Sequence, residues 1–221
     1  RKGDFSGAGV TIIDPVTRQP FPNNQIPANP LDPIAIKLLE WYPEPNIPGT
    51  GLVRNYLALQ HHVTDKDQFT GRVDFVESSK SSWFGRFSWT DEYVLAPNLK
   101  DNGQVVGTNV KQAMVSNTRT LSPSFVNEFR FGTTKFYNNL AQELQLKRNV
   151  HEEVGLGLFI PPPISWGLPN MSVGGVFSGF GDNPSLPFTG NNYVFQFIDN
   201  VSWIKGNHSM RMGAEVRNDH Y

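Results

Sequence analysis

Two adjacent histidines and two nearby aspartates are the residues of this sequence whose chemistry could bind a metal ion. His61 and His62 precede Asp65 and Asp67, and imidazole nitrogens and carboxylate oxygens are common ligands of divalent cations. On an extended chain, however, neighbouring side chains point to opposite faces, so the two histidines would not converge on one ion. We therefore expect a polar segment here and no metal site.

Three further patterns resemble parts of catalytic motifs, and each lacks an essential element. HEEVG at His151 has no second histidine, which a helical zinc-protease site requires. GAG at residues 7–9 neither follows a strand nor opens a helix, and it lacks the third glycine of a dinucleotide-binding loop. No Gly-x-Ser-x-Gly elbow is present. We therefore expect HEEVG to be a polar loop segment, and we expect neither an enzyme nor a cofactor.

The long segment 137–192 offers the best candidates for binding a ligand. It combines a stiff Pro-Pro-Pro run with glycines and with aromatic side chains that could stack on a glycan, a peptide or a partner surface. The alternative, which we favour, is that these aromatic residues pack a small core of the loop itself, as an ordered loop of this length requires. The candidate ligand-binding residues are Phe159, Trp166, Phe177, Phe180 and Phe188.

Three hairpins of alternating polarity surround this loop. They are expected at residues 67–91, 111–136 and 193–217, with turns at ESSKSS, SPS and KGNH. In each arm, apolar or aromatic side chains mostly occupy one parity, and polar side chains occupy the other. This pattern predicts an antiparallel sheet with two chemically different faces.

The first 51 residues are rich in Pro, Asn and Gly, a composition that excludes regular sheet and indicates an irregular loop. One short helix is expected near 33–42. Asp32 is a good N-cap, Pro33 suits the first helical position, and Pro43 ends the run. The apolar side of this helix is expected to pack on the loop.

The lengths of the arms and connections favour a transmembrane barrel over a soluble sandwich. Each arm has about ten residues, enough for a tilted strand to cross the hydrocarbon layer. The turns within hairpins are short, whereas the links at 91–110 and 137–192 are long, an asymmetry typical of outer-membrane barrels. A soluble sandwich would alternate in polarity too. Aromatic residues near the strand ends also favour the barrel: Trp83, Trp89, Tyr93, Tyr193 and Trp203.

The composition argues against several other classes of protein. A chain that is 38% hydrophobic is too apolar to be disordered, and its net charge of -1 with scattered Lys and Arg argues against nucleic-acid binding. No cysteine is present, which excludes disulfides and thiolate metal sites. No apolar stretch approaches the roughly 20 residues of a membrane-spanning helix. The chain opens at RKGDFSG without a targeting segment, so we expect an excerpt of a longer protein.

The succession of several phrases resembles the barrel region of Oar-like TonB-dependent outer-membrane proteins. The phrases are GDFSG, TIIDPVTRQPFPNNQIP, LDPIAIKLLEWYPEPN, TDKDQFTGRVDF, FGRFSWTDE, LSPSFVNEFRFG and FIDNVSWIKGNHSMRMGAEVR. The resemblance covers nearly the whole chain. It implies a large barrel in a Gram-negative outer membrane, with a plug domain and TonB as partners that lie outside this chain. Plugged transporters have 22 strands, so the six or seven expected here would form part of one.

In such a barrel the two parities of the hairpins would meet different surroundings. The residues expected to face lipid are Phe69, Val73, Phe75, Trp83, Phe87, Phe129, Phe131, Met210, Met212 and Val216. The residues expected to face the lumen are Arg72, Arg86, Glu128, Arg130, Arg211 and Glu215. Such wall charges are more often solvated or paired than used as substrate ligands. Asn127 and Asp199 share the lipid parity and interrupt the pattern.

We therefore expect residues 1–221 to form an all-β region. This region is an antiparallel up-and-down meander of long hairpins, part of a large outer-membrane β-barrel, with long irregular loops and one short helix. The resemblance implies the binding and energised transport of a bulky, unidentified solute, with outer-membrane lipid as a partner. The alternative is a non-transporting surface or secreted β-sandwich that binds glycan or protein.

Overall fold

The computed structural model describes residues 2–29, 31–49, 54–98, 102–157, 161–172 and 178–221. These residues fall into two compact units. The loop unit comprises 1–61, 96–104 and 142–186, and the sheet unit comprises 62–95, 105–141 and 187–221. Phe159 and Phe177, two of the candidate ligand-binding residues, lie outside the described residues.

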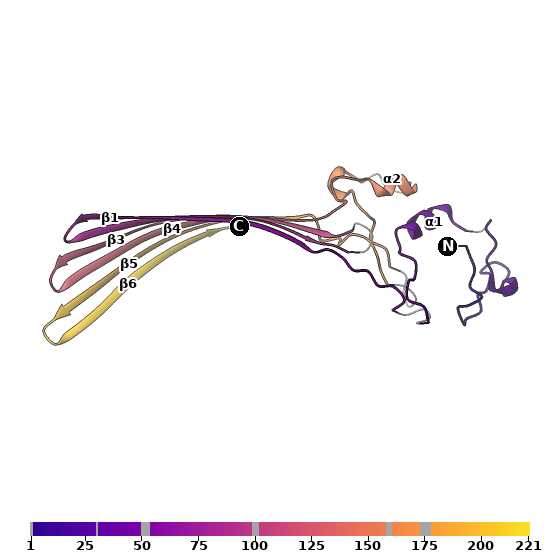
Figure 1. Ribbon diagram of the computed structural model, residues 1–221, viewed down its shortest axis with the longest axis horizontal. Coiled ribbons are helices and arrows are strands. Elements are labelled where there is room, and N and C mark those ends of the chain that lie inside the picture. The colour runs from indigo at the N-terminus through magenta and orange to yellow at the C-terminus, as the bar shows by residue number, and fades with distance from the viewer. Residues whose placement is uncertain (1, 30, 50–53, 99–101, 158–160, 173–177) are drawn as a thin grey trace. The chain divides into compact units, whose positions relative to one another are not determined.

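The sheet unit is a single six-stranded sheet in which the order of the strands follows the chain (Figure 1). Its strands are β1 (Val63–Ser78), β2 (Ser81–Ala96), β3 (Gln104–Ser122), β4 (Phe125–Gln142), β5 (Phe188–Lys205) and β6 (His208–His220). β1 and β6 form the two edges of the sheet. This antiparallel up-and-down meander confirms the expected all-β fold.

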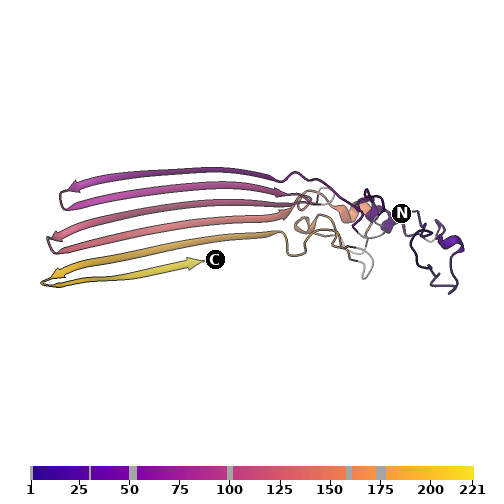
Figure 2. The same ribbon diagram turned by 60° about the horizontal axis from the view of Figure 1, so that its bottom comes forward.

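The connections between strands differ at the two ends of the sheet (Figure 2). Two-residue turns at 79–80, 123–124 and 206–207 join the three hairpins. Gly206, in the last of these turns, has φ +58, a left-handed conformation that glycine adopts without strain. The connections 97–103 and 143–187 leave from the opposite end. The sheet therefore has one end of tight turns and one end of long connections.

The strands run farther toward the long connections than the expected hairpins at 67–91, 111–136 and 193–217. β1 has 16 residues and β3 has 19, which at ~3.3 Å per residue corresponds to roughly 50–60 Å. The additional residues mix polar and apolar side chains on both faces, as Glu92, Val94 and Leu95 of β2 show, so the alternation of polarity does not reveal them. Their backbone groups still form the ladder, because strand hydrogen bonds do not depend on the polarity of side chains.

The loop unit contains the short helices. They are η1 (Pro22–Asn24), α1 (Pro33–Glu40), α2 (Val150–Val154) and η3 (Pro163–Ser165). α1 begins as expected, because the Asp32 carboxylate accepts hydrogen bonds from the backbone N–H groups of Ile34 and Ala35. The expected short helix is therefore confirmed, ending at Glu40.

The buried hydrophobic residues of the described chain all belong to the loop unit. They are Leu38 of α1, Val150 and Val154 of α2, and Leu168. Trp41 and Phe180 pack against this cluster. The apolar side of α1 therefore packs on α2 and Leu168 of the segment 142–186, and not on the first loop as the sequence predicts.

The expectation that HEEVG is a polar loop segment is wrong, because these residues lie in and directly after α2. The Asn149 side chain caps the helix by accepting from the Glu152 N–H, and Gly155 ends it in the left-handed conformation at φ +86. Val150 and Val154, one turn apart, are the buried side of the helix. A helix of five residues is too short for its periodicity to stand out in the sequence.

Candidate functional site

The pairing of β1 with β2 separates aromatic from charged side chains. Phe69 lies opposite Trp89, and Phe75 lies opposite Trp83, on one face. Arg72 lies opposite Arg86 on the other face. The parities read from the sequence therefore correspond to two real faces of this hairpin.

The same separation holds in the last three strands. Phe131 of β4 lies opposite Phe197 of β5, and Phe197 lies opposite Val216 of β6. The rings of Phe131 and Phe197 have centroids 4.7 Å apart. Ile198, on the other face, lies between Arg130 and Glu215.

Two side-chain hydrogen bonds show that each face continues from β2 through β3 to β4. Asn109 Nδ2 of β3 donates to Asp91 Oδ1 of β2 at 2.8 Å, and Asn138 Nδ2 of β4 donates to Thr108 Oγ1 of β3 at 3.0 Å. Side chains in direct contact across a ladder share a face. Asp91 shares its parity with Trp89, and Asn138 shares its parity with Arg130, so both faces are continuous from β1 to β6.

We call these two surfaces the aromatic face and the charged face. The aromatic face holds Phe69, Val73, Phe75, Trp83, Phe87, Phe129, Phe131, Met210, Met212 and Val216. The charged face holds Arg72, Arg86, Glu128, Arg130, Arg211 and Glu215. Val73 is 71% exposed and Val216 is 65% exposed. The aromatic face thus presents large apolar side chains that the described chain does not cover.

The apolar part of the aromatic face forms a band next to the tight turns. Toward the long connections the same face becomes polar: Asp65 lies opposite Tyr93, Asp67 opposite Asp91, and Lys135 opposite Tyr193. Near the tight turns Trp203 lies opposite Phe125 and Met210. Indole and phenol side chains therefore stand at both limits of the apolar band.

One polar pair interrupts the apolar band. Asn127 Nδ2 donates to Asp199 Oδ1 at 2.6 Å and to the Asn200 backbone oxygen at 3.3 Å. Each of these two side chains therefore satisfies part of the other's hydrogen-bonding capacity, which lowers the cost of placing them among apolar neighbours.

Most charges of the charged face are paired with one another. Salt bridges join Lys66 to Glu92, Arg72 to Asp74, Arg130 to Glu128, and Arg217 to Asp219. These pairs are exposed, so each contributes little to stability. Their effect is to leave the face strongly polar with little net charge.

A shallow hollow of about 180 Å³ lies on the charged face across β2 to β5. It is lined chiefly by Arg86, Gln112, Met114, Gly132, Thr134 and Gln196. Gly132 lies opposite Gln196 in the ladder, and the missing side chain leaves space between its neighbours. The sequence did not indicate this hollow, because the register that brings these strands together cannot be read from one chain.

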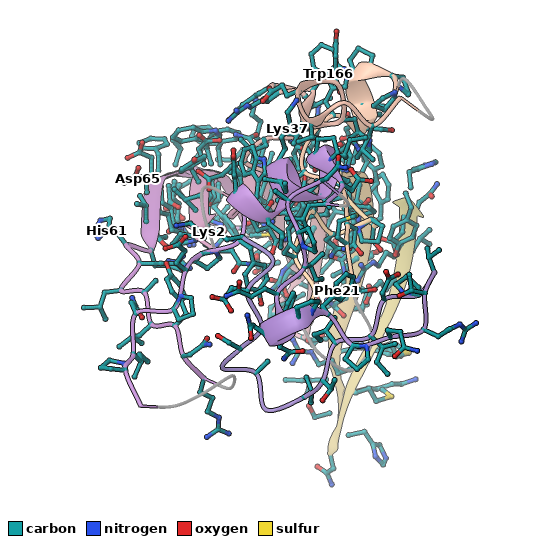
Figure 3. The ribbon with its side chains drawn as sticks, turned by 90° about the vertical axis from the view of Figure 1, so that its right-hand side faces the viewer. Lys2, Phe21, Lys37, His61, Asp65 and Trp166 are labelled. Atoms are coloured by element: carbon teal, nitrogen blue, oxygen red, sulfur yellow. The ribbon has the colours of Figure 1, made fainter. Side chains whose placement is uncertain are left out.

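The three described candidate residues of segment 137–192 have different surroundings. The Phe180 ring meets the Tyr42 ring edge-on at 5.6 Å and packs against the core of the loop unit. Trp166, labelled in Figure 3, donates from Nε1 to the Pro161 backbone oxygen at 3.2 Å. Phe188 begins β5 and is exposed. Phe180 thus follows the packing alternative, while ligand binding by Trp166 and Phe188 stays a prediction.

The histidine and aspartate segment is extended. Figure 3 shows Asp65 on β1 and His61 on the segment just before it. Asp65 and Asp67 lie on the aromatic face, opposite Tyr93 and Asp91. Among the residues that the structure describes, no group of three or more His, Cys, Asp or Glu side chains could hold a metal ion.

The loop unit contains a buried carboxylate, Asp182, that the sequence does not predict. Asp182 Oδ2 accepts from the Leu168 N–H at 3.0 Å, while Oδ1 is buried without a hydrogen-bond partner. Burial raises the pKa of Asp182 to about 6. One aspartate in a Gly-rich and Pro-rich loop carries no sequence signal for burial.

The outer membrane beta barrel domain family has a sequence profile that matches residues 1–221, the full length of the chain. The chain belongs to this family. Comparison with curated proteins and with solved structures gives no match. The family places the protein in the outer membrane, and it decides between the two architectures considered for the hairpins in favour of the barrel over the soluble sandwich.

The geometry of the sheet agrees with this membership. Family barrels cross the outer membrane with antiparallel strands that alternate between two chemically different faces, and the six strands here have that alternation. In the part of the chain that the structure describes, no helix is long and apolar enough to cross a membrane.

Proposed function

We propose that this chain forms part of the wall of a large TonB-dependent transporter resembling the Oar-like proteins, and that it takes part in binding and energised transport of a bulky solute. The observation that carries the proposal is the separation of an apolar aromatic face from a charged face over one continuous sheet. A barrel wall needs this separation, since one side meets acyl chains and the other meets water or a plug.

The aromatic face supplies the lipid contact in this proposal. Uncovered apolar side chains such as Val73, Phe75 and Val216 would be costly in water and gain their favourable environment in the hydrocarbon layer. The charged face lines the lumen, where Arg72 and Glu128 keep their hydration or their partners. The family membership supports a barrel wall with one lipid face and one lumen face, while the assignment of each side chain to a face rests on the strand register.

The long connections supply the surface that meets the solute. In outer-membrane barrels long connections are extracellular and tight turns are periplasmic. By this rule the segments 97–103 and 143–187, which contribute to the loop unit, belong to the outside of the cell. The core that Val150 and Leu168 form with Leu38 gives the described part of segment 143–187 a defined shape on which a solute could be captured.

The dependence on TonB rests on the ordered phrases that resemble the Oar-like proteins, and it is the part of the proposal to test first. The sequence has no cysteine, so Thr134→Cys in the complete protein places a single thiol of this region on the charged face. The reaction of this thiol with a bulky, membrane-impermeant maleimide is followed in intact cells with and without TonB.

We expect faster labelling of Thr134→Cys in cells that contain TonB, because energised displacement of a plug opens the lumen. A thiol at Ser185, an exposed residue of the long connection 143–187 that the reagent reaches from outside, normalises expression. Equal labelling rates with and without TonB would contradict energised transport and leave a passive or purely structural barrel.

A further inference from the structure

One guanidinium on the charged face lacks the partner that its neighbour has. Arg72 and Arg86 lie directly opposite each other in the β1–β2 ladder, and like charges in this position destabilise a strand pair. Arg72 is compensated, because it pairs with Asp74 at 2.7 Å and lies 4.2 Å from the centre of the Phe84 ring. Within the described residues Arg86 forms no salt bridge. Its positive charge is left for another partner.

Arg86 contributes to the wall of the hollow around Gly132. The other polar groups of that wall include the amides of Gln112 and Gln196 and the hydroxyl of Thr134. Gln196 Nε2 donates to Glu215 Oε1 at 2.6 Å. This hydrogen bond gives the nearby Glu215 carboxylate a partner and holds the Gln196 amide in one orientation. The hollow therefore combines one uncompensated cation with neutral hydrogen-bonding groups.

The size of the hollow limits what it can take. Its volume of about 180 Å³ is room for several water molecules. A carboxylate with a few neighbouring atoms fits in this space. A phosphate group carries nearly two negative charges at neutral pH and would require more cations than the single guanidinium of Arg86.

We propose that this hollow binds a carboxylate group of the solute that the barrel admits. The guanidinium of Arg86 is the ionic partner, since its planar N–H groups match the two oxygens of a carboxylate. Gln112 supplies a hydrogen bond at the side. The inference deepens the proposed function and rests on it, because the charged face must line a water-filled lumen for a solute to arrive.

The test uses Thr134→Cys in the complete protein, purified in detergent, with succinate as the carboxylate probe. A neutral, water-soluble maleimide reports access to the thiol in the wall of the hollow. We expect millimolar succinate to slow labelling several-fold relative to potassium chloride at equal ionic strength. Inorganic phosphate at the same concentration is expected to protect less.

Two changes in the hollow should abolish the protection by succinate. Arg86→Gln removes the cation, and Gly132→Ala narrows the hollow beside Gln196 without strain, because a Cβ there meets nothing nearer than the Ala113 oxygen at 3.9 Å. Two matched controls should retain it. Arg211→Gln makes the same charge change elsewhere on the charged face, and Gly85→Ala adds the same methyl group on the opposite face, where the nearest atom is the Met114 oxygen, also at 3.9 Å.

The outcomes separate this inference from the function on which it rests. Labelling that succinate and chloride affect equally, or protection that survives Arg86→Gln, overturns the carboxylate site while leaving the lumen assignment intact. Stronger protection by phosphate than by succinate overturns the choice of a carboxylate. A thiol at Thr134 that reacts only with lipid-soluble maleimides overturns the lumen assignment itself, and with it both proposals.

Discussion

Phe131 and Phe197 lie directly opposite each other on neighbouring strands with their ring centroids 4.7 Å apart. The next residue along β5, Ile198, lies on the other face between Arg130 and Glu215. Two apolar neighbours in sequence thus have different surroundings. This relationship allows the assignment of lipid and lumen to be tested by matched substitutions.

Phe197→Lys should destabilise the folded protein in a bilayer by about 2–4 kcal/mol, the cost of a lysine on the lipid side near the middle of the membrane. Ile198→Lys should cost less than about 1 kcal/mol, because the new ammonium group lies in a wet lumen opposite both Glu215 and Arg130, and Arg130 is already paired with Glu128. The measurement is urea unfolding of the complete protein in liposomes. Equal costs for the two substitutions would contradict the assignment of faces.

The cap of α1 gives a second prediction, within the loop unit. Asp32→Ala removes the acceptor of two backbone N–H groups, with N–O distances of 2.7 Å to Ile34 and 3.3 Å to Ala35. We expect a loss of roughly 1 kcal/mol in the local stability of α1, seen as faster hydrogen exchange in Pro33–Glu40. Asp32→Asn, which keeps an acceptor oxygen, is the control and should exchange nearly as slowly as the unmodified protein.

Asn24 organises the first loop. Its side chain donates to the backbone oxygens of Phe5 and Val10 and accepts from the Ile12 N–H, at 2.7, 2.6 and 2.6 Å. Asn24→Asp removes both donors and places a carboxylate beside two carbonyl groups, so we expect a local loss of about 2–3 kcal/mol. Asn23 has the same left-handed backbone, at φ +53 against +58 for Asn24.

Limited proteolysis of the segment 5–12 tests this role. Cleavage should accelerate markedly in Asn24→Asp and stay near the unmodified rate in the control Asn23→Asp. Similar cleavage of both variants would show that the added charge, and not the lost hydrogen bonds, opens the loop.

Asp182 should make the loop unit sensitive to pH. Its pKa in the folded protein, about 6, lies above its ordinary value of 3.8, so the folded state binds the proton more tightly than the unfolded chain. The resulting stability is fully present below about pH 4 and is lost as the pH rises through 6. Protection of the Leu168 amide against hydrogen exchange, corrected for the intrinsic rate, should therefore fall as the pH rises from about 4 to about 7.

Asp182→Asn provides the control for this prediction. The variant keeps an oxygen that can accept from Leu168 and carries no ionisable group, so its protection should be nearly constant over the same range. A fall of equal size in the variant would assign the pH dependence to another group.

The sequence predicts the faces of the sheet better than the extent of its strands. The alternation of Phe129, Arg130 and Phe131 can be read directly, because successive side chains of a strand point to opposite faces of the sheet. The strand ends toward the long connections mix polar and apolar residues on both faces, as Val94 and Leu95 beside Glu92 show, and give no such signal. Their place in the ladder follows from hydrogen bonds between backbone groups.

The features that depend on contacts between distant segments could not be predicted. The hollow requires Gly132 to lie beside Gln196 and near Gln112, and these neighbours follow from the register of three strands. α2 is too short for a periodic signal, and its burial depends on packing of Val150 and Val154 with Leu38. The resemblance to Oar-like proteins indicated the barrel family, which the match over residues 1–221 confirms at the level of outer-membrane barrels.

The limits of the apolar band suggest where the membrane lies. On β5, Tyr193 and Trp203 share the aromatic face and are about ten residues apart, which spans ~33 Å along a strand. With a tilt of roughly 40° this gives a height of ~25 Å, the usual height of the lipid-facing band between two aromatic girdles. Trp83 and Tyr93 on β2 have the same spacing.

A nitroxide scan of residues 193–203 on β5, in the complete protein reconstituted into liposomes, tests the account most directly. Collisions with oxygen report the lipid phase, and collisions with a water-soluble nickel chelate report the aqueous phase. We expect oxygen access to peak at odd-numbered positions and to be greatest near Phe197, and chelate access to peak at even-numbered positions such as Ile198 and Asn200. Equal access to the chelate on both parities would contradict a lipid-facing aromatic face and the barrel wall built on it.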